Sequence, residues 1–98
     1  MPIGSYSPIP HLASHLLKHR PDSVLDLGIG FGMTGAVVRQ WLDDGVQPFT
    51  TTLVGVEAWP QYRSVLWDLY DSLFMETIQQ FLVTRRDRFE LIVLGDVL

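Results

Sequence analysis

Residues 24–35 constrain the fold of this chain more than any other part of its sequence. They are Val-Leu-Asp-Leu-Gly-Ile-Gly-Phe-Gly-Met-Thr-Gly, which predicts a buried strand with a carboxylate near its end, a glycine-rich turn and the start of a helix. Glycine accepts positive φ and lets a ligand approach where a Cβ would clash. The first turn of a helix offers unpaired N–H groups and a partial positive charge. This pattern therefore predicts a site for a nucleotide or a nucleotide-like molecule.

Hydrophobic spacing along the rest of the chain alternates between helix and strand patterns. After an arm over 1–10, we expect helices over 11–19, 33–42 and 77–84 and strands over 24–27, 51–56, 72–75 and 89–94. In the helix over 33–42, Met33 and Trp41 are expected to face inward with their apolar neighbours. The clearest amphipathic-helix pattern follows Pro60, with apolar residues at 62, 65, 66, 69, 70 and 73.

Strands that alternate with helices predict an α/β fold, in which right-handed βαβ crossovers build a parallel sheet. The almost continuously apolar run over 89–94 is typical of a strand covered on both faces. With 98 residues, of which 47% are hydrophobic and 18% charged, the chain is expected to form one globular domain or part of one.

Charge and composition weigh against several functions. The net charge is −4 and the only basic cluster is Arg85, Arg86 and Arg88, so binding of nucleic acid by this segment alone is not expected. The chain has no cysteine, which excludes disulfides and thiolate metal sites and fits a cytoplasmic location. No apolar run approaches the roughly 20 residues of a membrane-spanning helix, so we expect a soluble chain without a membrane partner.

Three histidines recur every fourth residue on the first expected helix, at His11, His15 and His19. Two histidines at this spacing can share a zinc ion. Because no third ligand is evident nearby, we expect no metal site.

The glycine-rich stretch resembles the first motif of the class I S-adenosylmethionine-dependent methyltransferases, and the resemblance extends from about residue 11 to the end. It implies a truncated Rossmann-like parallel sheet of methyltransferase type, with strand order 3-2-1-4 and helices on both faces. By position, Asp26, Gly28, Gly30 and Gly32 would surround the methionine and ribose parts of the cofactor. Asp26 would meet the cofactor's ammonium group. S-adenosylhomocysteine would be the product of methyl transfer.

Later parts of the chain extend this resemblance. Glu57, after the second strand, matches the carboxylate that accepts hydrogen bonds from the ribose diol, and Trp59 could border the adenine. Glu76 falls where the family often has an acidic residue for the adenine amino group. Gly95 and Asp96 follow the fourth strand and would lie beside the transferred methyl group. Asp96 is the only candidate for a catalytic residue.

The family's fold continues with three further strands that shape the substrate site. The resemblance therefore implies that residues 1–98 are the N-terminal portion of a single cofactor-binding domain, either a fragment or a naturally short relative. Whether the chain alone is an active enzyme, and which molecule accepts the methyl group, stay open.

Two other functions are compatible with the same residues. Gly30, Gly32 and Gly35 have the spacing of the Rossmann dinucleotide fingerprint, and Glu57 lies near its expected acidic position. Asp26 argues against a nicotinamide dinucleotide, because its carboxylate would lie close to the pyrophosphate. The other alternative is a non-catalytic assembly module, in which the exposed edge of the fourth strand pairs with a second copy or a partner chain.

Overall fold

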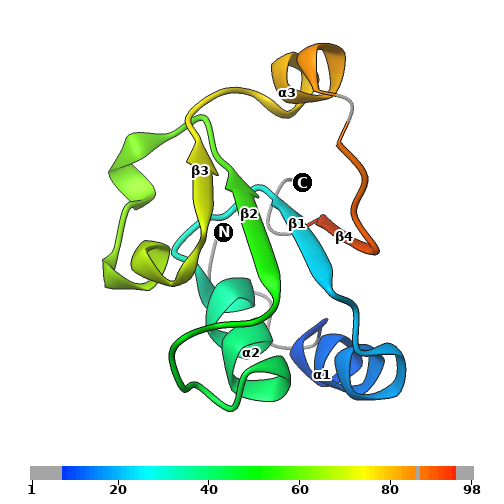
Figure 1. Cartoon of the computed structure of the whole chain (residues 1–98). Helices are drawn as coiled ribbons and strands as arrows, with labels where there is room; N and C mark the ends of the chain where they lie inside the picture. The colour runs from blue at the N-terminus through cyan, green and yellow to red at the C-terminus, as the bar shows by residue number, and fades with distance from the viewer. Residues whose placement is uncertain (1–7, 86, 95–98) are drawn as a thin grey trace.

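A four-stranded parallel sheet with the order β3-β2-β1-β4 organises the molecule (Figure 1). The computed structural model describes residues 8–85 and 87–94. In chain order the elements are α1 (Pro8–His19), β1 (Ser23–Leu27), α2 (Met33–Leu42), β2 (Thr52–Val56), η1 (Pro60–Tyr62), η2 (Val65–Leu69), β3 (Ser72–Phe74), α3 (Ile78–Thr84) and β4 (Leu91–Leu94), where η marks a 3₁₀ helix. The predicted α/β class, parallel sheet and strand order are confirmed.

Two apolar clusters cover the two faces of the sheet, because side chains alternate between faces along each strand. Val24 and Leu53 pack with residues of α1, α2 and η2 on one face. Leu25 and Val54 pack with Phe81 of α3 on the other face. The predicted placement of helices on both faces is therefore confirmed, and Figure 1 shows α1 and α2 side by side.

The helices α1 and α2 differ in detail from the prediction. Helix α1 begins at Pro8 rather than at His11, since proline is well tolerated in the first turn of a helix. The prediction that Met33 and Trp41 face inward is wrong, because these side chains are 36% and 41% exposed. The buried face of α2 is formed instead by Gly35, Val37, Val38 and Arg39.

Residues 60–73 do not form the amphipathic helix that their spacing predicts. The backbone of Arg63, with φ −56° and ψ 132°, ends η1 in an extended conformation. A second short helix, η2, then starts behind Ser64, whose side chain accepts a hydrogen bond from the Leu66 N–H. Val65 lies on the outside and is 81% exposed.

Strand β4 is covered on one face only. Leu91 and Val93 pack against the cluster under α1 and α2. Ile92 and Leu94 point to the other face and are 53% and 66% exposed. The expectation of burial on both faces is therefore wrong for the described residues, in which β4 pairs only with β1.

None of the helices within the described residues is both long and apolar enough to cross a bilayer.

Candidate functional site

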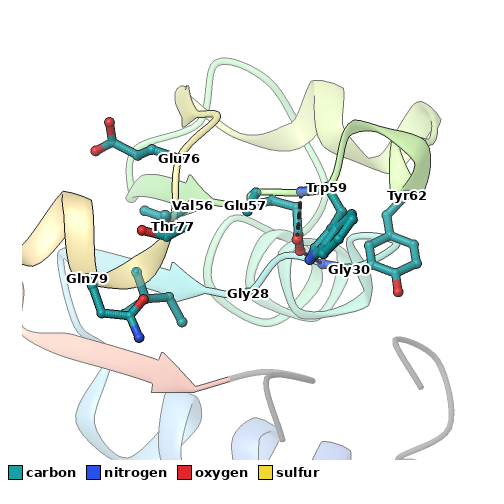
Figure 2. A pocket seen from close by; sticks show the side chains of 11 residues that line it. Gly28, Gly30, Val56, Glu57, Trp59, Tyr62, Glu76, Thr77 and Gln79 are labelled. Atoms are coloured by element: carbon teal, nitrogen blue, oxygen red, sulfur yellow. Dashed lines mark hydrogen bonds between the residues drawn. The ribbon is translucent and has the colours of Figure 1, made fainter.

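A pocket of about 430 Å³ lies where β1 and β2 end, beside the connection from β3 to α3 (Figure 2). Its lining consists of Gly28, Gly30, Val56, Glu57, Ala58, Trp59, Tyr62, Glu76, Thr77, Ile78 and Gln79. Open parallel sheets bind ligands at this edge, outside the carboxyl ends of the strands. The volume lies within the range of about 300–1,000 Å³ that is usual for small-molecule sites.

Glu57 joins two walls of this pocket. Its buried carboxylate accepts one hydrogen bond from the Gly30 N–H at 2.8 Å and another from the Trp59 N–H at 3.2 Å. Each carboxylate oxygen has two acceptor positions. Glu57 therefore orients both backbone segments and keeps acceptor capacity for hydroxyl groups of a ligand.

Aromatic side chains form one side of the pocket. Figure 2 shows Trp59 and Tyr62 together there, with Glu76, Thr77 and Gln79 on the opposite side. The Tyr62 ring packs edge-on against Phe31, with 5.5 Å between ring centroids, and this contact limits its movement. Trp59 is exposed, so its ring is available to a flat ligand.

Glu76 carries a buried oxygen, Oε1, without a hydrogen-bond partner among the described residues. Leaving such an atom unpaired costs about 1–3 kcal/mol, and more when the group is charged. The neighbouring Thr77 is fixed by a capping box with Gln80 at the start of α3. Glu76 thus lines the pocket from a well-ordered segment, and Figure 2 shows its carboxylate directed away from Trp59 and Tyr62.

The charge of the pocket is negative. Glu57 and Glu76 are the ionisable carboxylates of the described lining, which includes no lysine, arginine or histidine. Such a site favours hydroxyl and amino donors or a cationic group, and it disfavours phosphate.

The glycines of the first motif divide between two roles. Gly28 and Gly30, with φ of +86° and +58°, line the pocket. Gly32 does not line it, although φ is also positive there, at +98°. A Cβ at Gly32 would lie 2.8 Å from the Leu66 Cβ, so packing against η2 requires glycine at this position.

Asp26 also lies outside the pocket lining. Its carboxylate is fully buried, and Oδ2 accepts a hydrogen bond from the Tyr70 hydroxyl at 2.5 Å. The same hydroxyl oxygen accepts from the Gly35 N–H at 3.0 Å. Burial raises the pKa of Tyr70 well above its ordinary value, and the negative charge of Asp26 adds to this effect. The phenol therefore stays protonated and keeps donating to Asp26.

The structure thus brings together Gly28, Gly30, Glu57, Trp59 and Glu76 in one lining, of which Asp26 and Gly32 are not part. Gly95 and Asp96 lie outside the described residues. Sequence reasoning missed Tyr62, whose apolar spacing suggests only a core position. It also missed the hydroxyl of Tyr70, because nothing in the sequence pairs that residue with Asp26.

The exposed histidines of α1 lie away from the pocket lining. The rings of His15 and His19 are 4.3 Å apart between centroids. No group of three or more possible metal-ligating side chains occurs within residues 8–85 and 87–94.

Comparison with solved structures assigns the fold. A methyltransferase from Podospora anserina, PaMTH1, in its complex with S-adenosylhomocysteine (SAH), matches 95% of this chain with a TM-score of 0.74 and 15% sequence identity. The match covers 42% of the length of that chain. No protein-family model and no curated protein matches this chain. The chain has a class I methyltransferase-like fold, in which the described residues form a parallel sheet with the strand order 3-2-1-4.

Proposed function

We propose that the pocket binds S-adenosylmethionine and that this chain is the cofactor-binding part of a methyltransferase. The observation that carries the proposal is the Glu57 carboxylate, which two backbone N–H groups hold beside an aromatic wall in one negatively charged pocket. The SAH in the matched solved structure supports the same ligand class.

The residues suit the parts of this cofactor. Glu57, held by two backbone N–H groups, retains acceptor positions for both hydroxyls of a ribose. We assign the amino group of adenine to Glu76, which lines the same pocket. Trp59 offers a flat apolar surface beside the base.

The remaining assignments complete this proposal. Backbone at Gly28 and Gly30 can approach the cofactor closely, and Gly95 and Asp96 would lie near the methyl group. The bound cofactor supplies the methyl group, while residues of this chain bind and orient it. The methyl acceptor would be held by elements beyond these four strands.

The same charge distribution disfavours a nicotinamide dinucleotide. A pyrophosphate carries negative charge, which the two pocket carboxylates would repel without a compensating cation in the described lining. S-adenosylmethionine has a cationic sulfonium and an ammonium group instead. We therefore favour S-adenosylmethionine over a nicotinamide dinucleotide as the ligand of this pocket.

Titration calorimetry with SAH, S-adenosylmethionine and NAD⁺ tests this proposal. We expect saturable binding of the two adenosyl compounds and none of NAD⁺. Glu57→Gln should weaken SAH binding about tenfold to a hundredfold, since it removes a charged acceptor worth about 1.5–3 kcal/mol. Asp87→Asn, at an exposed carboxylate between α3 and β4, is the matched control and should bind like the wild type.

The absence of heat with either adenosyl compound, for a wild-type protein with a cooperative thermal transition, would exclude the proposal. Tighter binding of NAD⁺ than of SAH would instead favour the dinucleotide alternative.

The edge of β4 supports a second candidate function, an assembly module that pairs with a second copy of this chain. Within the described residues this edge has no strand neighbour, and Ile92 and Leu94 are exposed beside it. Two copies related by a two-fold axis could pair these edges antiparallel. Sedimentation velocity across micromolar concentrations tests this, and a strictly monomeric species at every concentration contradicts it.

A further inference from the structure

Three side chains at a spacing of three residues connect the η2 segment to the β1–α2 connection. Ser64 Oγ donates to the Phe31 carbonyl at 2.5 Å. Trp67 Nε1 donates to the Gly30 carbonyl at 2.8 Å. Tyr70, at the end of η2, donates to Asp26 just before the glycines. We call Ser64, Trp67 and Tyr70 the clasp, and residues 28–32 the glycine loop.

Trp67 lies within η2, whereas Ser64 and Tyr70 are its N-cap and C-cap residues and have extended backbones. A 3₁₀ helix has three residues per turn, so side chains at i and i+3 project from the same face. In an α-helix with 3.6 residues per turn, each successive member would be rotated by about 60° from the one before. The spacing of three residues therefore suits the 3₁₀ segment between the two cap residues, and hydrogen bonds to Phe31, Gly30 and Asp26 fix the three side chains.

Glycines of the loop, α2 and β2 allow η2 and Tyr70 to pack closely. A Cβ at Gly32 would collide with Leu66, and a Cβ at Gly35 would overlap the Tyr70 ring. A Cβ at Gly55 would lie 2.8 Å from Cδ2 of the same ring. Glycine at these positions leaves the space that η2 and Tyr70 occupy.

Gly30 is held from both sides of the loop. Its N–H points to Glu57 at the pocket, and its carbonyl accepts from Trp67, which is fully buried and is not part of the lining. The Phe31 carbonyl is likewise occupied by Ser64, away from the pocket lining. The clasp thus fixes which backbone groups the loop presents to a ligand.

We propose that Ser64, Trp67 and Tyr70 are positioning residues that hold the glycine loop in the shape required for cofactor binding. This inference rests on the proposed function. Asp26 takes part through Tyr70, and its carboxylate anchors the clasp from beneath the pocket. Loss of the Ser64 or Trp67 hydrogen bond frees a loop carbonyl, and loss of the Tyr70 hydroxyl frees the Asp26 carboxylate. The loop then samples shapes that do not fit the ligand.

The experiment combines SAH titration with amide hydrogen exchange measured by NMR on the unliganded protein. Trp67→Phe keeps an aromatic ring and removes the donor, Tyr70→Phe removes only the hydroxyl, and Ser64→Ala is the mildest change. Val65→Ala, in the same segment but exposed, is the control. We expect each clasp variant to weaken SAH binding about tenfold and to speed exchange at Gly30 and Gly32 more than at residues 53–56 of β2.

Ser64→Thr, which retains a hydroxyl, should recover affinity and slow exchange, and Val65→Ala should resemble the wild type. Unchanged SAH affinity in the clasp variants would overturn the inference. So would acceleration of all amides together, because that result indicates a general loss of stability.

The two readouts separate this inference from the proposed function. If the wild type binds no SAH, the proposed function fails. Exchange in the unliganded protein then still decides whether the clasp immobilises the loop. If Trp67→Phe or Tyr70→Phe does not fold, Ser64→Ala together with Ser64→Thr provides the decisive comparison.

Discussion

At the scale of single residues, the first motif combines two demands on glycine that its sequence does not separate. Gly28 and Gly30 line the pocket, whereas Gly32 and Gly35 leave room for the segment packed behind the loop. The glycine spacing correctly predicts a turn with positive φ. The packing role depends on a contact with residues more than thirty positions away, which a local pattern cannot reveal.

Gly32→Ala tests the packing role, with Gly45→Ala as the matched control. Both positions have positive φ, but a Cβ at Gly45 meets only the flexible Gln40 side chain, at 3.5 Å. The free energy of unfolding of each variant should fall by about 1–2 kcal/mol, because alanine is strained in the left-handed backbone conformation. For Gly32→Ala the free energy of unfolding should fall by about 1–3 kcal/mol more, because the new Cβ also displaces Leu66. Urea unfolding measures both, and equal losses would contradict the packing role.

The change Glu76→Gln is expected to affect the stability of the unliganded protein and its binding of SAH in opposite directions. Its buried Oε1 has no partner among the described residues, so Glu76→Gln should raise the free energy of unfolding of the unliganded protein by about 1 kcal/mol. The same change should weaken SAH binding, since a neutral amide is a poorer acceptor than a carboxylate. Thermal unfolding with and without SAH measures both effects. A variant that is less stable without ligand would show that Glu76 has no unsatisfied charge.

At the scale of elements, the predictable parts are those whose pattern is set by their own side chains. Strands β1 and β2 and helix α2 lie close to their predicted ranges because apolar runs and a glycine-rich turn determine them locally. Residues 60–73 were not predictable, because their spacing is that of an α-helix and does not show that the backbone becomes extended at Arg63, Ser64 and Tyr70. Ser64 and Trp67 bond the glycine loop and Tyr70 bonds Asp26, and these partners lie more than thirty positions away in the sequence.

Arg39 joins three elements at the opposite end of the sheet from the pocket. The buried guanidinium donates to the carbonyls of Leu69, the last residue of η2, and Thr51, just before β2. It also bonds Asp43 at the end of α2 and Asp71 before β3, both at 3.0 Å. Removal of one partner would leave the buried charge of Arg39 uncompensated and would destabilise the fold. This network therefore fixes α2 against β2 and η2.

Asp43 makes this network sensitive to acid. Partial burial by itself raises the pKa of Asp43, but hydrogen bonds from Thr50, Arg39 and Thr51 together lower it below its ordinary value of 3.8. A carboxylate with a lowered folded-state pKa stabilises the fold above the unfolded-state pKa, and the contribution is lost as the pH falls through the folded-state pKa. The loss should therefore begin near pH 4 and continue in more acidic solution.

Asp43→Asn should lower the free energy of unfolding at pH 7 by about 1–3 kcal/mol, because it removes a charged hydrogen-bond acceptor. The variant should also lose less stability than the wild type between pH 7 and pH 3. Urea unfolding at both pH values gives the comparison. Asp44→Asn is the control, since Asp44 is the exposed neighbour and asparagine tolerates its positive φ of 54°. An equal loss in wild type and Asp43→Asn would exclude this account.

At the scale of the whole molecule, the site is more predictable than the surface. Five of the sequence-derived positions, Gly28, Gly30, Glu57, Trp59 and Glu76, meet in one pocket because parallel strands bring their carboxyl ends to one edge. The apolar run of β4 correctly predicts a strand but not which faces are covered. Coverage depends on the elements packed beside β4, and within the described residues α3 lies over Leu25, Leu27 and their neighbours rather than over Ile92.

The exposed face of β4 leads to the last prediction, the double variant Ile92→Lys with Leu94→Lys. Two lysines on this face should repel a second copy and increase the monomer fraction in sedimentation velocity, because charge on an edge strand opposes pairing. The free energy of unfolding of the monomer should change by less than about 1 kcal/mol, since exposed positions contribute little to folding. Val93→Lys is the control. Its side chain packs against the cluster under α1 and α2, so this change should destabilise the fold itself. If the double variant associates as strongly as the wild type, β4 is not the surface through which copies of this chain pair.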